Sequence, residues 1–310
     1  MMNAARQAVE YAARELGFSG VGVARADADQ GPELAAWLQA GCHGDMTWLE
    51  RHLPARLNPQ LVLPRVRSVV MLTYDYARQD ARLAPGAMAR YAQGEDYHKL
   101  LAAKLADLDE TLSFYGGQQR CFSDSGPVSE RFFAVQAGLG WRGRNGLLVR
   151  PRGGSFCFLS CILTTLELPV DKPMPPRCGS CHRCEQACPT GALHEGVCDA
   201  RKCLSYWTIE AKGEPPPEIC AALGEHMYGC DVCQEVCPWN SLPPARRVDA
   251  HLLMPFALAA ATPQQLAAMQ QEEFESFFQG SPVRRIGAEH LRSNIGHLSS
   301  PADLNTRTAD

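Results

Sequence analysis

The cysteine content constrains this chain more than any other feature. Fourteen of the 310 residues are cysteine, and ten of these lie in the segment 178–238. That segment has little apolar periodicity, so hydrophobic packing alone cannot hold it together. The first residues carry charges such as Arg6 and Glu10 and contain no apolar run, which predicts a cytoplasmic chain without an export signal. Cysteines at this density in such a chain indicate metal binding rather than disulfide bonds.

The spacing of these cysteines predicts two [4Fe–4S] clusters. Residues 178–189 read C-x2-C-x2-C-x3-C-P, and residues 230–238 read C-x2-C-x3-C-P. In bacterial ferredoxins the first three cysteines of such a run bind one cluster, and the cysteine before proline binds the other. A zinc site fits less well, because it needs four ligands and usually pairs two C-x2-C units that lie further apart.

The ligand sets follow from this crossed arrangement, except for one ligand. Cluster one is predicted to bind Cys178, Cys181, Cys184 and Cys237. The second run lacks its first cysteine, because Met227 occupies that position. Cluster two therefore takes Cys188, Cys230, Cys233 and one of Cys198, Cys203 and Cys220. Loop-closure entropy grows too slowly with loop length to choose among these three. The remaining cysteines are interpreted as core residues: Cys42, Cys121, Cys157 and Cys161.

Helical and strand patterns alternate through the first 165 residues, which predicts one α/β or α+β domain. The expected helices are 3–17, 33–40, 96–115 and 128–137, and the expected strands are 21–24, 67–74, 119–122, 146–149 and 155–164. Asp96 is the expected N-cap of the longest helix. A proline-rich stretch at 168–176 reads as a linker, and two further helices are expected at 263–278 and 283–298.

Composition excludes several functions. No run of eighteen apolar residues occurs, so no membrane span is expected. The net charge of −4 gives no bulk attraction to nucleic acid, although four arginines in 142–152 could clamp phosphates or simply line a solvated hairpin. No G-x-G-x-x-G motif follows a strand, so a Rossmann site is unsupported. Asp96 and His98 begin a cobalamin-ligand-like D-x-H-x-x-G motif, but Leu101 replaces its glycine, so His98 is not expected to bind cobalt.

Asp124 lies in FSDSGPVSER, between a predicted strand and a predicted helix. One interpretation is a helix N-cap or turn carboxylate, which is common in such a sequence. The other is a general acid, whose pKa would have to be raised by partial burial. The residue pattern alone favours the first interpretation.

Several segments together resemble the epoxyqueuosine reductase family, in the right order and over nearly the whole chain. The segments are RLNPQLVLP at 56–64, RYAQGEDYHK at 90–99, SDSGPVSER at 123–131, AGLGWRGRNGLL at 137–148, CGSCHRCEQACPTGAL at 178–193, CLSYWTIE at 203–210, MYGCDVCQEVCPWN at 227–240 and GSPVRRIG at 280–287.

The resemblance implies an α+β fold of the α/β sandwich type in three parts. A nitroreductase-like cobalamin-binding domain would span 1–167, a two-cluster ferredoxin-like domain 168–243, and a short helical segment 244–310. It implies that Cys203 is the eighth cluster ligand and that Asp124 is the proton donor. Cobalamin would bind base-off, without a protein histidine, among Asp124, Arg56, Tyr97, Leu148, Ser155, Leu159, Glu210, Asn240 and Ser241.

The implied reaction is the last step of queuosine synthesis, in which epoxyqueuosine at the wobble position of tRNA is reduced to queuosine. The epoxide oxygen leaves as water, which requires two electrons and two protons. The clusters would feed cob(I)alamin, and Asp124 would protonate the departing oxygen by a nucleophilic or a radical route. Expected partners are tRNA and a low-potential flavodoxin or ferredoxin, and we expect a monomer. The rival functions are a reductive dehalogenase-like cobalamin enzyme acting on a small molecule and a ferredoxin-type electron carrier.

Overall fold

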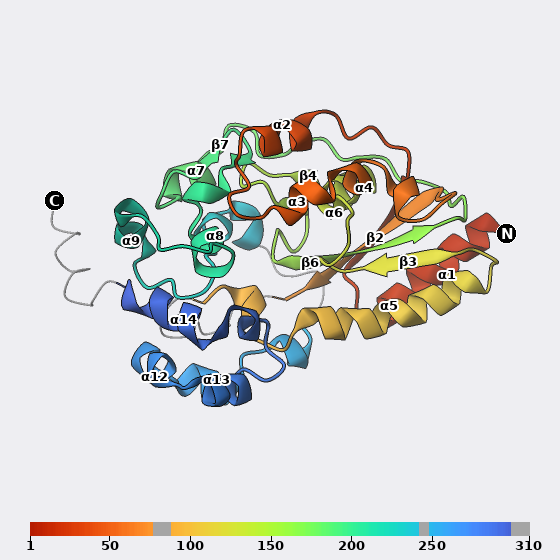
Figure 1. Cartoon of the computed structure of the whole chain (residues 1–310). Helices are drawn as coiled ribbons and strands as arrows, with labels where there is room; N and C mark the ends of the chain where they lie inside the picture. Colours follow the sequence, from red (N-terminus) through yellow and green to blue (C-terminus); the bar gives the residue numbers. More distant parts are fainter. Residues whose placement is uncertain (77–87, 242–247, 299–310) are drawn as a thin grey trace.

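A four-stranded antiparallel sheet forms the centre of the N-terminal part of the molecule (Figure 1). The computed structural model describes residues 1–76, 88–241 and 248–298. The strand order is β1 (Gly20–Arg25), β2 (Ser68–Asp75), β6 (Cys157–Thr164) and β3 (Gln119–Phe122). All eight residues of β2 are buried, as expected for a central strand covered on both faces. The antiparallel pairing makes this an α+β fold.

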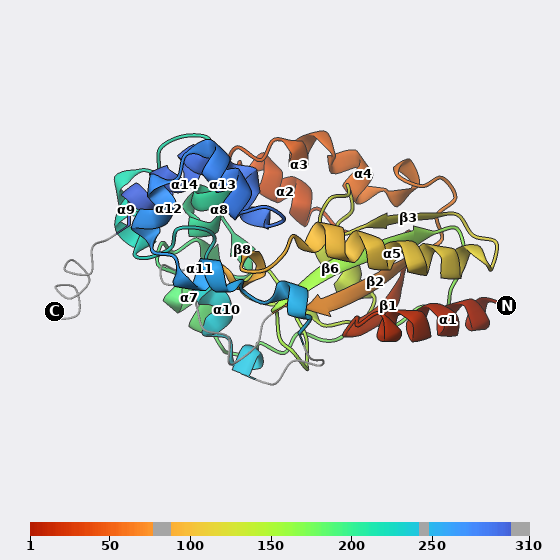
Figure 2. The ribbon, with the colours of Figure 1, turned by 90° about the horizontal axis from the view of Figure 1, so that it is seen from below.

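Helices cover both faces of the sheet. On one face, α1 (Met2–Glu15) and α5 (Tyr97–Ser113) lie side by side, as Figure 2 shows. Their buried residues, including Val9 and Leu108, pack with Ile162 of β6. On the other face, α6 (Glu130–Gln136) contributes the fully buried Phe133 to a second core. Each buried leucine or phenylalanine contributes about 1.5–3 kcal/mol relative to an exposed one, so both layers fix the sheet firmly.

The sequence correctly predicts how α5 begins. The side chain of Asp96 accepts a hydrogen bond from the backbone N–H of His98 at 3.0 Å, so Asp96 is the N-cap. Leu101, Leu105, Leu108 and Leu112 form the buried face of this helix. Tyr97, in its first turn, is thereby held in a fixed position at one end of the sheet.

The cysteine-rich part consists of short elements with little core of their own. These are α7 (Arg183–Ala187), β7 (Leu193–His194), β8 (Val197–Cys198), α8 (Leu204–Ile209), α9 (Pro217–Leu223) and α10 (Val232–Glu235). One small apolar cluster, built on Leu204, Ile219 and Leu223, joins α8 to α9. This agrees with the expectation that hydrophobic packing alone does not hold the segment together.

The predicted helix 263–278 is wrong, because the chain forms two helices there. They are α12 (Pro263–Ala268) and α13 (Gln271–Phe277), and Gln270 starts the second one with its own capping box. The guanidinium of Arg292 donates to the carbonyls of Ala267 and Met269 at 3.0 and 2.9 Å. These bonds satisfy carbonyl groups that an uninterrupted helix would have used internally.

Other boundaries differ more modestly from the predictions. The expected strand 146–149 shortens to β5 (Leu148–Val149), which pairs with β4 (Trp141–Arg142). The predicted helix 283–298 is α14 (Gly287–Gly296), preceded by a 3-10 turn. Short helices also form as α2 (Glu33–Gln39), α3 (Trp48–Arg51), α4 (Leu53–Leu57) and α11 (Phe256–Ala260). The 3-10 turns are Pro59–Leu61, Arg90–Ala92, Ala200–Lys202, Pro238–Ser241, Ala250–Leu252 and Pro282–Ile286.

The C-terminal helices pack back onto the rest of the molecule. Phe274 and Leu291 share an apolar core with Met88 and Tyr228, so this segment contacts both preceding parts of the chain. The expected boundary between residues 243 and 244 and the residues after 298 lie outside the described residues. Among the described residues, no helix is long and apolar enough to cross a membrane.

Candidate functional site

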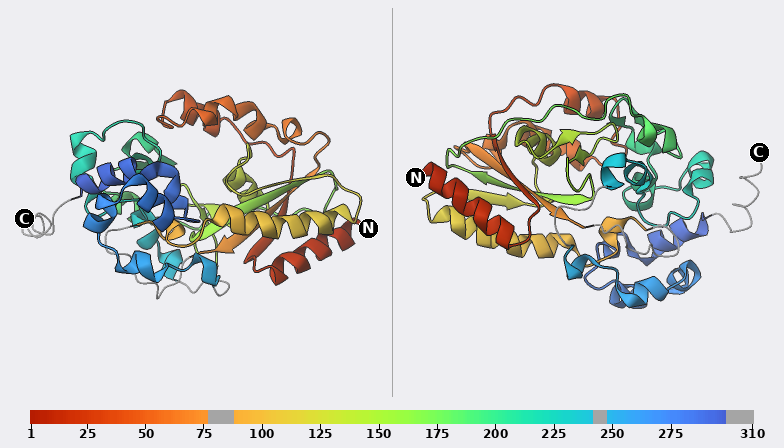
Figure 3. Two further views of the ribbon diagram at one scale, coloured as in Figure 1. Left: turned by 60° about the horizontal axis from the view of Figure 1, so that its bottom comes forward. Right: turned by 180° about the vertical axis from the view of Figure 1, so that it is seen from behind.

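The candidate site lies where one edge of the sheet meets the cysteine-rich part (Figure 3). The end of β2 pairs with the start of β6 through Asp75 and Cys157, and the end of β3 pairs nearby through Phe122 and Cys161. The loop after β3 carries Asp124. Antiparallel pairing therefore brings two strand ends, one strand start and the first turn of α5 to the same edge.

Asp124 adopts an uncommon backbone conformation. Its φ is 59°, in the left-handed region that side chains other than glycine rarely occupy. Its backbone N–H donates to Oε1 of Glu130 at 2.9 Å, and the side chain is 65% exposed. The N-cap interpretation of Asp124 is wrong, because α6 begins six residues later with Ser129 in the cap position. Strain of this kind at an exposed carboxylate is typical of a functional residue.

Tyr97 fixes the orientation of the Asp124 carboxylate. Its hydroxyl donates to Oδ2 of Asp124 at 2.7 Å. Its ring is 6% exposed and stacks on Phe158 with ring centres 4.0 Å apart. Burial, and then the neighbouring Asp124 charge, raise the pKa of Tyr97 well above its ordinary value, so the hydroxyl remains a donor.

Glu130 is a partly buried acid behind Asp124. Burial, followed by repulsion from the Asp124 carboxylate, raises the pKa of Glu130 to about 8. Glu130 is therefore largely protonated at neutral pH. Sequence reasoning missed this residue, although it stands inside SDSGPVSER, because nothing in the spacing marks it as buried.

Arg56 supports the same loop from the other side. Its Nη1 donates to the carbonyl of Val128 at 3.0 Å. Its Nε is buried and has no hydrogen-bond partner among the described residues. A buried donor of this kind fits an acceptor group on a bound ligand. Leu159 reaches this area through its carbonyl, which accepts from Ser123 Oγ at 3.0 Å.

A second group of predicted cobalamin-lining residues joins the two parts of the chain. Asn240 accepts from the backbone N–H of Ser155 at 2.6 Å and donates through Nδ2 to Ser155 Oγ at 3.0 Å. Ser155 Oγ also bonds to Gln234, which lies between the cysteines at 233 and 237. Ser241 follows Asn240 directly. These bonds connect the sheet edge to the cysteine-rich part.

Two of the residues predicted to line cobalamin, Leu148 and Glu210, pack against other parts of the molecule. Leu148 is 4% exposed and packs in the core with Phe133 and Leu163. Glu210 accepts from Arg285 Nη2 at 2.6 Å, so it pairs with the C-terminal segment. The described contacts therefore join neither residue directly to Asp124.

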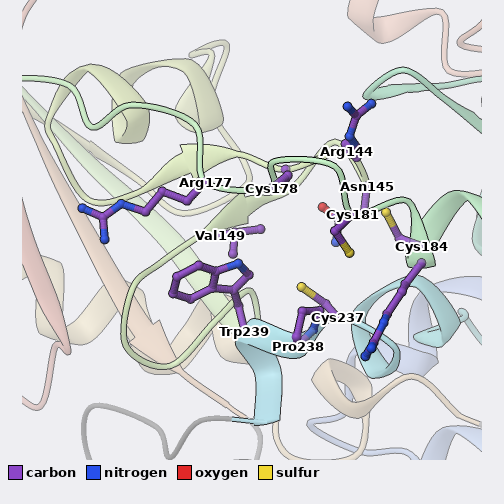
Figure 4. A pocket seen from close by; sticks show the side chains of 12 residues that line it. Arg144, Asn145, Val149, Arg177, Cys178, Cys181, Cys184, Cys237, Pro238 and Trp239 are labelled. Atoms are coloured by element: carbon purple, nitrogen blue, oxygen red, sulfur yellow. The ribbon is translucent and has the colours of Figure 1, made fainter.

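Four of the predicted cluster-one ligands line a cavity of about 360 Å³ (Figure 4). They are Cys178, Cys181, Cys184 and Cys237. The indole N–H of Trp141 lies 3.4 Å from the Cys178 sulfur, as a donor to it. Since one water molecule takes about 30 Å³, the cavity has room for an inorganic group of many atoms. The donor set and the space fit a [4Fe–4S] cluster.

The thiols predicted for cluster two influence one another, and all four are partly buried. Burial raises the pKa of Cys230 to about 12, and the neighbouring Cys203 and Cys188 thiols add to this shift. The neighbouring Cys230 and Cys203 thiols likewise raise the pKa of Cys233. Cys188, Cys203, Cys230 and Cys233, from three separate segments, therefore lie close enough to influence one another's pKa, and their role as ligands of cluster two stays a prediction. A metal centre would have to displace their protons on binding.

The structure sets one of the three candidates for the eighth ligand, Cys220, apart from the other two. Cys203 and Cys198 both lie beside Cys233, and a hydrogen bond from Cys198 lowers the pKa of the Cys203 thiol below its ordinary value. Cys220 lies elsewhere, where its sulfur donates to the carbonyl of Pro215 at 3.3 Å. Of the cysteines interpreted as core residues, Cys161 is fully buried.

Arg150 is not available to clamp a phosphate. Its Nη2 lies 2.5 Å from Oδ1 of Asp75, and both side chains are buried. Nη1 donates to Ser19 Oγ at 2.8 Å and to Thr73 Oγ1 at 3.2 Å. The phosphate-clamp interpretation of the 142–152 loop is therefore wrong for this arginine, which instead ties the loop to the sheet.

Two families match this chain. The family described as "Epoxyqueuosine reductase QueG, DUF1730" matches residues 56–125, and the family described as "4Fe-4S double cluster binding domain" matches residues 177–240. The first range includes Arg56, Tyr97 and Asp124. The second includes all eight predicted cluster ligands.

Curated relatives match over most of the chain. One from Gloeobacter violaceus, named epoxyqueuosine reductase, is 43% identical over 302 residues, covering 92% of this chain and 93% of the relative. Another of the same name from Escherichia coli is 39% identical over 316 residues, covering 94% of this chain and 79% of the relative. Both alignments run through the sheet, the cysteine-rich part and the C-terminal helices.

Solved structures are similar over the same extent. An epoxyqueuosine reductase with an epoxyqueuosine-modified tRNA-Tyr stem loop has a TM-score of 0.85 at 28% identity, covering 94% of this chain and 80% of that one. One from Bacillus subtilis, with its aspartate catalytic loop swung out of the active site, has a TM-score of 0.84 at 28% identity over 98% of this chain and 84% of that one. A catabolic reductive dehalogenase reaches a TM-score of 0.51 at 17% identity over 95% of this chain and 38% of that one, a likeness of fold alone.

Proposed function

Because this chain belongs to the epoxyqueuosine reductase family, we propose that it reduces epoxyqueuosine in tRNA to queuosine, with Asp124 as the proton donor. The observation that carries this proposal is the placement of Asp124. Its exposed carboxylate is oriented by Tyr97 and stands at the sheet edge that meets two groups of thiols. Proton delivery and electron supply thus converge on one place.

Two [4Fe–4S] clusters supply the electrons in this proposal. Cys178, Cys181, Cys184 and Cys237 would hold cluster one, and Cys188, Cys203, Cys230 and Cys233 would hold cluster two. The cavity lined by the first set and the mutual proximity of the second set support this division. The Cys184 thiol of the first set raises the pKa of Cys233 in the second set, so the two clusters would be neighbours.

Base-off cobalamin is the group that we propose to bind between the sheet edge and the cysteine-rich part. Arg56 offers an unpartnered buried donor there, and Ser155 with Asn240 forms part of the wall. Tyr97, Leu159 and Ser241 border the same region, whereas Leu148 and Glu210 would contribute from further away. When bound, a corrin would supply low-potential electrons to the epoxide.

The side chains of this protein then handle the protons. Asp124 donates a proton to the departing epoxide oxygen, so that no free alkoxide has to form. Tyr97 keeps the carboxyl pointing toward the reacting atoms through its hydrogen bond. Glu130 holds the Asp124 backbone in its strained conformation by accepting its N–H. Overall, two electrons and two protons convert the epoxide to an alkene and water.

The substrate must present its modified base in an extruded conformation. A base stacked in an anticodon loop cannot reach a site between two parts of a protein, so it must unstack first. The exposure of the Asp124 side chain leaves a path for such a base. The tRNA itself would remain on the surface.

A turnover assay tests the proposal. The protein would be reconstituted anaerobically with iron, sulfide and cobalamin, then mixed with dithionite and tRNA that carries epoxyqueuosine. Mass analysis of the digested tRNA should show loss of one oxygen atom from the modified nucleoside. If both cofactors are bound but no conversion occurs, the substrate assignment is wrong, and release of halide from a halogenated phenol would identify the rival function.

A further inference from the structure

Three arginines surround the cavity of cluster one, and we define them as the arginine rim: Arg144, Arg177 and Arg183. They come from the loop between β4 and β5, the linker before the cysteines, and α7. Among the described residues that line this cavity, none is aspartate or glutamate. Three separate segments thus bring positive charge to one opening of a protein whose net charge is −4.

Carboxylates of the protein itself neutralise little of the positive charge of the arginine rim. Arg177 and Arg183 are both exposed, and neither forms an ion pair with a residue of the described ranges. Of the three arginines, Arg144 alone pairs with a described carboxylate, and its Nη1 lies 3.9 Å from Oε1 of Glu185. The rim therefore presents net positive charge to solvent.

The orientation of Arg177 argues against a role confined to the cluster. Figure 4 shows its guanidinium directed away from the labelled cysteines, whereas Arg144 lies on another side of them. A guanidinium that served to balance the negative charge of a cluster would point toward the thiolates. An outward guanidinium suits an external anionic partner instead.

We propose that the arginine rim is the docking surface for an acidic, low-potential, one-electron carrier protein that reduces cluster one. This inference rests on the proposed function, because it takes the two-cluster assignment from it. At each encounter one electron leaves the carrier and enters cluster one, and no bond forms or breaks. Two encounters supply the pair of electrons that one epoxide requires.

The electron then has a short route inward. Cluster one is bordered by exposed residues such as Gly179 and Ser180, whereas Asp231 and Gln234, beside cluster two, are buried. Cys184 of the first set and Cys233 of the second set interact. Entry at the exposed cluster and exit at the buried one agree with this difference in depth.

Nucleic acid is a weaker candidate for the rim. Phosphates would also bind arginine, but the substrate must place its base against Asp124. The residues lining the cluster-one cavity include none of those that contact Asp124. A carrier on the rim and a tRNA base at Asp124 would therefore contact different residues.

The test reverses the two exposed charges in the reconstituted holoenzyme, as Arg177→Glu with Arg183→Glu. The matched control is Arg120→Glu, an exposed arginine on the edge strand β3. Binding of oxidised flavodoxin, an acidic carrier, is measured by calorimetry at low and high salt. Turnover is driven either by reduced flavodoxin or by dithionite, a small donor that needs no docking surface. Iron content verifies that both clusters are retained.

The double variant should bind flavodoxin about tenfold more weakly, raise its KM by a similar factor and lose most of the salt dependence of binding. Dithionite-driven turnover should stay within about twofold, and Arg120→Glu should behave like the wild type. If charge reversal loosens a cluster, Arg177→Gln with Arg183→Gln should show the same pattern with a smaller change.

Three outcomes would overturn the inference. Unchanged flavodoxin affinity would mean that the rim is not the docking surface. An equal loss of dithionite-driven turnover would mean that the arginines serve the cluster. Weaker tRNA binding with normal flavodoxin binding would assign the rim to nucleic acid. Failure of the proposed function looks different, because the wild type would then leave epoxyqueuosine unchanged with dithionite while flavodoxin binding remains measurable.

Discussion

The hydroxyl of Tyr97 lies 2.7 Å from Oδ2 of Asp124 and donates a hydrogen bond to it. The two residues belong to parts of the chain with different mechanical properties. Tyr97 is in the first turn of a seventeen-residue helix, whereas Asp124 is in a loop with a strained backbone. The bond thus ties an exposed carboxylate on a loop to a donor held in the core.

Replacing Asp124 with asparagine should abolish proton donation and leave the cofactor sites intact. A positioned general acid contributes about 10²–10⁴-fold to rate, so Asp124→Asn should reduce kcat by at least about a hundredfold. Mass analysis of digested tRNA gives the rate, and iron content gives cluster occupancy. Asp107→Asn, an exposed aspartate of α5, is the control. Turnover of Asp124→Asn close to that of the wild type would remove Asp124 from the mechanism.

Tyr97→Phe should preserve the fold and weaken the orientation of Asp124. The phenyl ring can keep its stack on Phe158, but the donor to Asp124 is lost. A hydrogen bond to a charged group contributes about 1.5–3 kcal/mol when shielded, and Asp124 is largely exposed, so we expect a fall in kcat of about tenfold. KM for tRNA should change little. A change confined to KM would mean that Tyr97 binds substrate instead.

Glu130 predicts a specific pH dependence of stability. Its pKa in the folded protein is about 8, above the ordinary 4.5, so the folded state keeps a proton that the unfolded state has released. Stability therefore falls as pH rises through this window, by at most about 1.4 kcal/mol per pH unit. Glutamine has no carboxyl group to titrate, so the stability of Glu130→Gln should not change with pH in this way.

The variant should consequently gain melting temperature relative to the wild type at pH 8, with little difference near pH 4.5 and below. Thermal unfolding of both proteins in the same cofactor state measures this. A difference between the two proteins that is the same at pH 5 and pH 8 would show that Glu130 titrates in the ordinary range.

Cysteine replacements should separate ligands from neighbours. Cys203→Ser should lose about half of the bound iron, because one of two clusters fails to assemble. Cys198→Ser and Cys220→Ser should retain all of it. Cys198 is the sharper control, since its thiol contacts Cys203. Iron analysis and electron paramagnetic resonance of the reduced protein give the result, and iron loss from Cys198→Ser rather than Cys203→Ser would exchange their roles.

Gly154→Ala should disturb the wall that Ser155 and Asn240 form. Gly154 has a φ of 59°, and a Cβ there would collide with the Asn240 amide. The hydrogen bonds between Asn240 and Ser155 would then break. We expect weaker cobalamin binding with normal iron content, measured by visible absorption during titration. Gly116→Ala, a left-handed glycine with open space around it, controls for backbone strain. Equal cobalamin affinity in wild type and Gly154→Ala would place the corrin elsewhere.

Local patterns in the sequence predict the regular parts of this protein well. The leucine spacing of α5 and its Asp96 cap are visible in the sequence because both depend on neighbouring residues. The break at Gln270 is not predicted, because glutamine is not among the preferred N-cap residues, and Arg292, which donates to the carbonyls at the break, comes from another helix. The short helices of the cysteine-rich part lack enough turns to show a period.

In the candidate site, too, the sequence predicts what depends on neighbouring residues and misses what depends on distant contacts. Cysteine spacing predicts two sets of four thiols, because most ligands of a cluster occur at fixed short spacings along the chain. Residue patterns alone leave the eighth ligand open, and they miss the burial of Glu130 and the pairing of Arg150 with Asp75. All three features depend on contacts between residues that are distant along the chain or on how deeply a loop is buried. The periodicity of the sequence predicts neither.

Strand β3, which precedes Asp124, is four residues long and pairs on one side only, with β6. Displacing the loop that follows it would break the bonds to Tyr97 and Glu130 but leave β1, β2 and β6 paired. The acid therefore follows the shortest strand of the sheet, at the edge where displacement would break the fewest hydrogen bonds between strands.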